Sequence, residues 1–278
     1  MCIRDRAIRA GRLIGADDAA IKQLLDEIGL MIRDIPLNST SPEIAEMIYA
    51  RIHAVTGCDD PYGEIKKQST EKALEIYPWL KELVANADNP FVAAVKIAIA
   101  GNIIDFGVHD TFDLNREVET ALDCDFAFDD FDRLAEALVE ANDILYIGDN
   151  AGETVFDRVL IEQIGKRVRY AVRGGPVIND VTYDDAVQAG IDRCADIVTT
   201  GSATPGAVLE RSNEKFRELF RSADCVISKG QGNYEALSES GRTVFFLLKA
   251  KCDVIARDLG VKRNAFIVKA ITPDVVKG

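Results

Sequence analysis

The sequence predicts a three-layer α/β/α sandwich with a mostly parallel sheet, preceded by a helical N-terminal region. The 278 residues are 47% hydrophobic and 28% charged, which is ordinary for a globular protein with one large domain or two smaller ones. In the first part of the chain, apolar residues recur at helical spacing. Beyond residue 142, short β-rich apolar runs alternate with amphipathic helical segments. This alternation is typical of βαβ units, whose parallel sheet is covered on both faces.

The first part of the chain should form four helices. Ser41 is suited to an N-cap, Pro42 to a first helical position and Gly57 to a helix end. Pro78 is expected to kink or break the third helix, whereas the fourth is apolar nearly all round, as a buried helix would be. The predicted helices are residues 17–33, 41–57, 70–87 and 90–104. The start, MCIRDR, has no capping signal, and we interpret it as a truncated or altered N-terminus.

An acidic stretch, residues 115–132, separates the two parts. Its segment DCDFAFDDFD lacks the glycine and glutamate that an EF-hand calcium loop needs at positions six and twelve. We therefore interpret the stretch as a solvated linker leading into a helix at 131–141. The predicted division is a helical region at 1–115, a connector and helix at 116–141, and a metal-binding α/β/α domain at 142–278.

The alternating part predicts six strands with five helices between them. The strands are residues 143–148, 167–175, 196–201, 225–230, 243–248 and 265–270, and the helices are residues 153–165, 182–191, 207–223, 233–240 and 252–260.

The composition and charge of the chain exclude some classes of function. The 46 acidic and 33 basic residues give a net charge of -13, which disfavours nucleic acid as a partner. No apolar run approaches the length of a membrane span. The six cysteines are scattered without a C-x-x-C pair, as expected of a reduced, cytoplasmic protein. The two histidines, His53 and His109, have no ligand partners at zinc-site spacing.

Polar residues follow four of the predicted strands, and open parallel sheets bind ligands at this edge. Asp149, Asn150 and Asp180 offer two carboxylates and an amide oxygen, a set that suits Mg²⁺ or Mn²⁺. Taken singly, each aspartate has a structural interpretation as a helix N-cap. Because polar residues of this kind follow several strands at the same edge, we favour a ligand-binding site.

Other strand ends supply groups that suit an anion. Arg173 and Lys229 can neutralise a phosphate, although Lys229 alone could be a surface residue. Backbone amides near Gly201 and Ser202, where a helix is expected to begin, can bind the same group. A metal, cationic side chains and backbone amides together are typical of phosphoryl transfer.

Asn102 and Asp105 interrupt the apolar fourth helix at a spacing that places them on one face. Buried polar side chains need partners, so one interpretation is a hydrogen bond between helices. The other is that this helix lies over the strand ends and completes a substrate pocket.

Five segments of the chain resemble the damage-control phosphatase family: AGNIIDFG, IGDNAGETVFD, GGPVINDVTYDDA, TTGSATPG and SKGQGNYEAL. The family was long catalogued as domain of unknown function eighty-nine, and its human relative is described as acidic-residue methyltransferase-like. The resemblance runs from about residue 90 to the end and is to the small microbial subfamily, whose members often begin with a cysteine-containing motif that this sequence does not show clearly.

The resemblance implies a divalent-metal-dependent phosphatase acting on small phosphorylated metabolites, including sugar phosphates. Metal ligation would fall on Asp149, Asn150 and Asp180, and Lys229 would contact the phosphate. The general base stays open between Glu153, Asp105 and a metal-bound water. The metal stays open between Mg²⁺, Mn²⁺, Co²⁺ and Ni²⁺, as do the physiological substrate and the oligomeric state.

Three alternatives remain on the residues alone. An S-adenosylmethionine-dependent carboxyl methyltransferase has a similar first strand end, but here no G-x-G-x-x-G follows it. A haloacid-dehalogenase-type phosphatase needs Asp-x-Asp after the first strand, and Asn150 and Ala151 follow Asp149 instead. A non-catalytic phosphate-binding module would need neither turnover nor metal.

Overall fold

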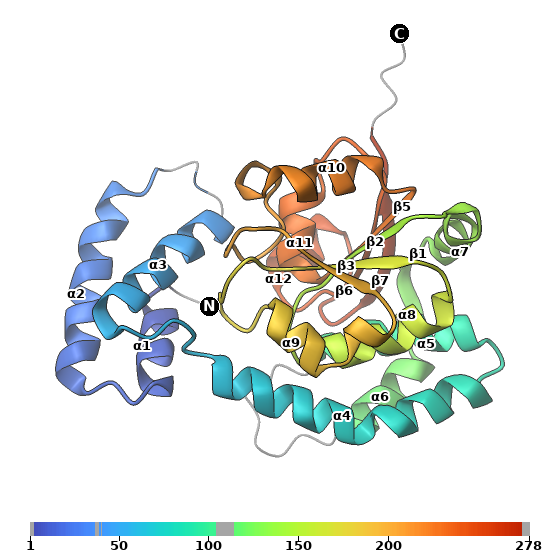
Figure 1. Cartoon of the computed structure of the whole chain (residues 1–278), viewed down its shortest axis with the longest axis horizontal. Helices are drawn as coiled ribbons and strands as arrows, with labels where there is room; N and C mark the ends of the chain where they lie inside the picture. Colours follow the sequence, from blue (N-terminus) through green and yellow to red (C-terminus); the bar gives the residue numbers. More distant parts are fainter. Residues whose placement is uncertain (1–2, 37–38, 40, 104–113, 274–278) are drawn as a thin grey trace, which may run out of the picture.

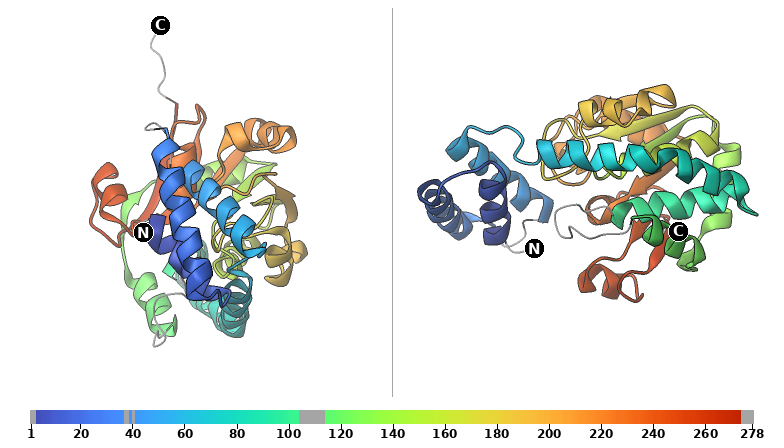
Figure 2. Two further views of the ribbon diagram at one scale, coloured as in Figure 1. Left: turned by 90° about the vertical axis from the view of Figure 1, so that its left-hand side faces the viewer. Right: turned by 90° about the horizontal axis from the view of Figure 1, so that it is seen from below.

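The computed structural model describes residues 3–36, 39, 41–103 and 114–273. Its first three helices are α1 (Ile3–Leu13), α2 (Asp18–Asp34) and α3 (Ser41–Thr56), which confirms two predicted helices. Asp17 caps α2 by accepting a hydrogen bond from the Ala20 amide at 2.8 Å. These helices share their own apolar cluster, which includes Leu24, Ile28 and Ile48. Figures 1 and 2 show them grouped at one end of the molecule, outside the sheet.

Two longer helices lead into the sheet. Helix α4 (Gly63–Asn86) starts earlier than predicted and continues through Pro78, so the expected break is wrong. Proline removes one helical hydrogen bond, but α4 buries Ala73, Leu80 and Val84 against the body of the protein, and this packing holds the helix together. Helix α5 (Pro90–Ala100) is buried as predicted and ends in a 3₁₀ turn, η1 (Gly101–Ile103).

The acidic stretch is not a linker. It contains all but the first residue of helix α6 (Leu114–Asp123), strand β1 (Phe126–Asp129) and the start of helix α7 (Phe131–Glu140). Strand β1 pairs in parallel with β7 (Phe266–Ile271), the last strand along the chain. Phe126 and Phe128 alternate with outward-facing residues, which is the pattern of a half-buried edge strand. The density of acidic residues concealed this alternation in the sequence.

The sheet has seven strands in the order β1-β7-β6-β5-β2-β3-β4. All neighbouring strands are parallel except β6 and β7, so the predicted α/β/α sandwich with a mostly parallel sheet is confirmed. The remaining strands are β2 (Ile144–Ile147), β3 (Val168–Val172), β4 (Asp196–Thr199), β5 (Cys225–Lys229), β6 (Val244–Lys249) and β7 (Phe266–Ile271).

The order of the strands reverses at β2. From β2 the chain proceeds outward through β3 to β4, and then returns to place β5 on the other side of β2. Connections leave β2 and β5 in opposite directions, so a crevice is expected beyond their carboxyl ends. Asp149 and Asn150 follow β2, and Gly230 follows β5, so these residues flank this switch point.

Side chains alternate between the two faces of the sheet. Ile144 and Tyr146 of β2 belong to the core beneath α4, α5 and α8 (Thr154–Ile164), whereas Leu145 and Ile147 belong to the core beneath α10, α11 and α12. Figure 1 shows these two helical layers on opposite sides of the sheet. Helix α9 (Tyr183–Gln188) lies on the α4 side; the opposite layer consists of α10 (Glu214–Ser222), α11 (Gly230–Leu237) and α12 (Asp253–Asp258).

The helix predicted at 207–223 is wrong in its first half. Residues Leu209–Arg211 form a 3₁₀ turn, η3, and α10 begins only at Glu214. The Asn213 side chain sets this start because its Oδ1 accepts a hydrogen bond from the Phe216 amide at 2.8 Å. A further 3₁₀ turn, η2, spans Ile191–Arg193. Among the described residues, no helix is long and apolar enough to cross a membrane.

Candidate functional site

Backbone hydrogen bonds bring the ends of β2 and β3 together. The Val181 amide donates to the Asp149 carbonyl at 2.9 Å, and the Ala151 amide donates to the Asn179 carbonyl at 2.9 Å. Asn150 and Asp180 form an isolated antiparallel bridge between these two hydrogen bonds. The three residues predicted to be metal ligands therefore lie beside one another, at the switch point of the sheet.

The turn that carries Asp180 is strained. Ile178 has a φ of +48°, a conformation that β-branched residues rarely adopt. The Asp180 amide donates back to the Val177 carbonyl at 3.1 Å, which closes the turn. Val177 and Ile178 pack against the apolar cluster of the N-terminal helices. Packing against the helical region thus holds the strained turn and fixes the position of Asp180.

Two asparagine amides link the half-buried carboxylate of Asp149 to the fully buried carboxylate of Glu153. Asn102 Nδ2 donates to Asp149 Oδ2 at 3.2 Å and to Glu153 Oε2 at 2.8 Å. Asn150 Nδ2 donates to the same two oxygens, at 3.1 Å in each case. Asn102, which comes from η1, thus reaches the strand ends and also bonds to the residue that precedes α8, so both interpretations of Asn102 fit; its role in binding a substrate stays a prediction. Asp105, its predicted companion, lies outside the described residues.

Lys229 lies behind these carboxylates and is fully buried. Its ammonium group donates to Glu153 Oε1 at 2.5 Å, Asp157 Oδ1 at 2.6 Å and the Ala98 carbonyl at 2.7 Å. Asp157 also accepts hydrogen bonds from the hydroxyls of Tyr146 and Tyr170, both at 2.8 Å. The surface interpretation of Lys229 is therefore wrong, and the residue holds together a buried ionic network.

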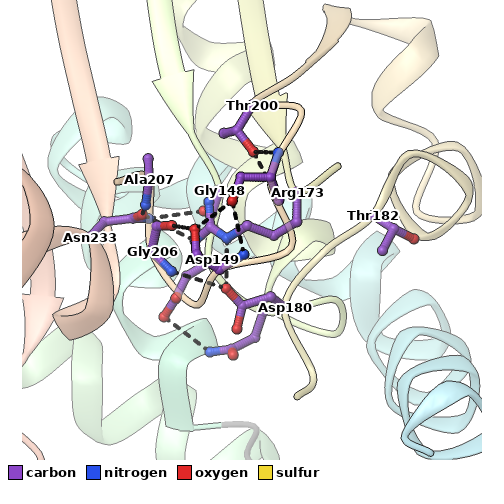
Figure 3. Close-up of polar contacts among 12 residues, drawn as sticks. Gly148, Asp149, Arg173, Asp180, Thr182, Thr200, Gly206, Ala207 and Asn233 are labelled. Carbon is purple, nitrogen blue, oxygen red and sulfur yellow. Dashed lines mark hydrogen bonds and ion pairs between the residues drawn. The ribbon is translucent and has the colours of Figure 1, made fainter. Parts of the chain in front are cut away.

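Arg173 lies at the end of β3 and is 1% exposed. Figure 3 shows its guanidinium group between Asp180 and Asn233. Nε donates to Asp180 Oδ2 at 2.7 Å and Nη2 donates to Asn233 Oδ1 at 3.0 Å, whereas the buried Nη1 has no partner within the described residues. Because a buried donor without a partner is costly, Nη1 is suited to an anionic ligand.

Asn233 joins the ends of β2 and β5 to the loop after β4. Its amide donates to the carbonyls of Gly148 and Lys229 at 3.0 and 2.7 Å, and its Oδ1 also accepts from the Ala207 amide at 2.8 Å. Asn233 is fully buried, and Figure 3 shows it beside Arg173. It therefore fixes the orientation of the arginine.

Gly201 and Ser202 lie in this loop, but no helix begins there, so that part of the prediction is wrong. Their amides donate to the hydroxyls of Thr199 and Thr200 at 3.0 and 3.4 Å. The loop packs closely on the end of β3, where a Cβ on Gly174 would lie 2.4 Å from the Gly201 carbonyl carbon. The two residues border the site, but their amides are engaged within the loop.

The carboxylates of the site carry excess negative charge. Burial raises the pKa of Asp149 well above its ordinary value, and the charges of Glu153 and Asp180 raise it further. Burial also raises the pKa of Asp180, although Arg173 opposes the shift. A bound cation would relieve this crowding.

The donor chemistry fits a hard divalent cation, with two carboxylates and the Asn150 amide oxygen as ligands. Among the described residues, no three His, Cys, Asp or Glu side chains gather into a metal-binding group. The predicted set accordingly needs the asparagine as its third donor.

Sequence reasoning missed three residues near the site. Asp157 follows Glu153 by four residues on α8, and such an acidic pair within an apolar helix face signals a buried cation nearby. Asn233 belongs to the motif SKGQGN. Lys251, which follows β6, lies near enough for its charge to lower the pKa of Asp149. No sequence pattern distinguished it from a surface lysine.

A cavity of about 540 Å³ lies between α3 and the strained turn. Its lining includes Tyr49, His53 and Asp60 from the helical region, Val177 and Ile178 from the turn, and Ala203 from the loop after β4. The volume is typical of small-molecule pockets. The cavity is lined by the same turn and loop that border Asp180 and Ser202.

Comparisons with known proteins agree on one family. The family described as "Damage-control phosphatase ARMT1-like domain" matches residues 1–267. A damage-control phosphatase of Archaeoglobus fulgidus is 32% identical over 97% of this chain and 96% of its own length. Another, of Pyrococcus horikoshii, is 38% identical over 86% of this chain and 84% of its own.

The fold comparison agrees. A crystal structure of a protein from Pyrococcus horikoshii, described as a member of the DUF89 family, superposes on this chain with a TM-score of 0.88 at 34% identity. The match covers 98% of this chain and 96% of the other.

Proposed function

The chain belongs to the damage-control phosphatase ARMT1-like family, and from that premise we propose that it is a divalent-metal-dependent phosphatase that hydrolyses small phosphorylated metabolites such as sugar phosphates. The phosphatase role rests on the relatives, which carry that name at 32% and 38% identity over most of the chain. The metal, the substrate class and the roles of individual residues are our proposal.

The observation that carries the proposal is the buried Nη1 of Arg173, which has no hydrogen-bond partner in the described part of the chain and lies beside the crowded carboxylates. Asp149, Asn150 and Asp180 would hold the cation, which supplies Lewis-acid polarisation and charge neutralisation when bound. Arg173 binds a phosphate oxygen through Nη1 while Asp180 and Asn233 fix its orientation. A cation and a guanidinium group side by side are suited to a phosphate monoester.

The organic part of the substrate would occupy the cavity between α3 and the strained turn. Its lining combines apolar groups such as Val177 and Ala203 with polar groups such as Asp60 and His53. These polar groups are suited to the hydroxyl groups of a sugar. Its volume of about 540 Å³ limits the substrate to a small metabolite.

The test is release of inorganic phosphate from a panel of sugar phosphates and other small phosphate esters, in the presence of Mn²⁺. We expect turnover of at least one ester, and loss of about two orders of magnitude or more in Asp180→Ala, because that change removes a ligand and the partner of Arg173. Undiminished turnover in Asp180→Ala would place the reaction elsewhere. Phosphate binding without turnover of any ester would favour the binding-module alternative.

A further inference from the structure

The orientation of the Asn150 amide decides whether this residue can bind a cation. Its Nδ2 lies 3.1 Å from both Asp149 Oδ2 and Glu153 Oε2. Ionised carboxylates only accept hydrogen bonds, so the NH₂ group must face them. The carbonyl oxygen Oδ1 then points away from Asp149 Oδ2 and Glu153 Oε2. If the amide flipped, Oδ1 would face two anionic oxygens, and the NH₂ group would face the cation.

Glu153 is itself held rigidly. It is fully buried in the turn before α8, and its two oxygens receive hydrogen bonds from Lys229, Asn102 and Asn150. A residue without exposed surface is poorly placed to exchange protons with a substrate. This geometry disfavours Glu153 as the general base.

Lys229 has no donor left for a phosphate. An ammonium group has three N–H donors, and those of Lys229 are directed to Glu153, Asp157 and the Ala98 carbonyl. Because its side chain is fully buried, a phosphate could reach it only by displacing one of these partners.

We propose that Glu153 and Lys229 are positioning residues, an inference that rests on the proposed function. Lys229 fixes Glu153, and Glu153 orients the Asn150 amide so that the amide oxygen faces the metal. This assignment replaces the expected roles of Glu153 as a base and of Lys229 as a phosphate contact. Residues that orient a metal ligand without touching the metal typically contribute about 10- to 100-fold in metal affinity.

The test compares Glu153→Gln in two backgrounds, by calorimetric titration with Mn²⁺ alone. In the native background, the single side-chain oxygen of the glutamine can accept hydrogen bonds from the amides of Asn102 and Asn150 or from the ammonium group of Lys229, but not from both sides. We expect the affinity to fall about 10- to 100-fold. Lys229 keeps Asp157 as a charged partner, so the variant should fold.

In the Asn150→Asp background we expect no loss of Mn²⁺ affinity. The substituted carboxylate has no amide to orient and is repelled by Glu153, so Glu153→Gln should leave Mn²⁺ affinity unchanged or raise it. The matched control is Glu162→Gln on α8, the helix that follows Glu153; the Glu162 carboxylate contacts Tyr77 and Arg158. That control should leave affinity unchanged. The electron paramagnetic resonance spectrum of bound Mn²⁺ should change in Glu153→Gln and not in the control.

An equal loss in both backgrounds would overturn the inference, as would no loss in the native one, while the proposed function stands. If the unaltered protein binds none of Mg²⁺, Mn²⁺, Co²⁺ and Ni²⁺, the proposed function fails and the inference falls with it.

Discussion

Replacing Lys229 with methionine should destabilise the protein by about 3–5 kcal/mol. Methionine has a similar length and no charge, so the change leaves Glu153 and Asp157 buried without their cation. Breaking a buried ion pair from one side typically has this cost. In the native protein, burial alone would lower the pKa of Lys229, but the charges of Asp157 and Glu153 outweigh burial and raise it. The direction of that shift indicates a net stabilising network.

The loss should depend on pH. Burial raises the pKa of Asp157 even though Lys229 opposes the shift, and without Lys229 the pKa will rise further. A carboxyl group with a raised pKa binds more protons in the folded state, so its contribution to stability decreases as pH rises through that pKa. The deficit of Lys229→Met should therefore be smaller at pH 5 than at pH 8.

Urea unfolding followed by circular dichroism measures both effects. The control is Lys81→Met, whose half-exposed ammonium group pairs with Glu162 at 2.7 Å and should change stability by less than about 1 kcal/mol. If Lys229→Met is as stable as the control, or loses more stability at pH 5 than at pH 8, the ionic network does not stabilise the fold as argued.

Four further predictions each concern a single residue. Arg173→Lys removes the Nη1 donor, so the KM for a phosphate ester should rise about tenfold or more in steady-state assays. Gly230→Ala should weaken Mn²⁺ binding in calorimetry, because Gly230 has a φ of +77° and a Cβ would lie 1.8 Å from Asp149 Oδ2; unchanged affinity would contradict that packing. Ala50→Trp, at an exposed position lining the cavity, should raise KM without altering metal affinity; an unchanged KM for every ester would separate the cavity from the substrate. Burial raises the pKa of Cys225 to about 12, so mass spectrometry should find it unalkylated by iodoacetamide at pH 8 until urea unfolds the chain.

Local sequence predicted the metal-ligand candidates because they follow two predicted strands: Asp149 and Asn150 come just after β2, and Asp180 lies in the turn beyond β3. Asp149 and Asp180 needed only the correct strand ends and the rule that parallel strands meet ligands at their carboxyl edge. The return of the chain to place β5 beside β2 is not encoded in any local pattern. That return brings Lys229 behind Glu153, and it is the reason that burial of the lysine was not predicted.

Composition misled the interpretation of 115–132. Acidic residues outweighed the alternation of Phe126 and Phe128, which pack against the sheet only because β7 supplies the pairing edge. The helix boundary at Glu214 was missed for a related reason. The apolar residues of 207–211 fit a helical period, whereas the Asn213 cap decides where α10 starts.

Phosphate release by the metal-stripped protein, with Mg²⁺, Mn²⁺, Co²⁺ and Ni²⁺ added back one at a time, tests the central claim most directly. Para-nitrophenyl phosphate and the sugar phosphates are the substrates, and Asp149→Ala is the matched variant. The account predicts no turnover without metal, turnover with at least one metal, and loss of that turnover in Asp149→Ala. Full turnover by the stripped protein, or metal-dependent turnover that survives in Asp149→Ala, would contradict it.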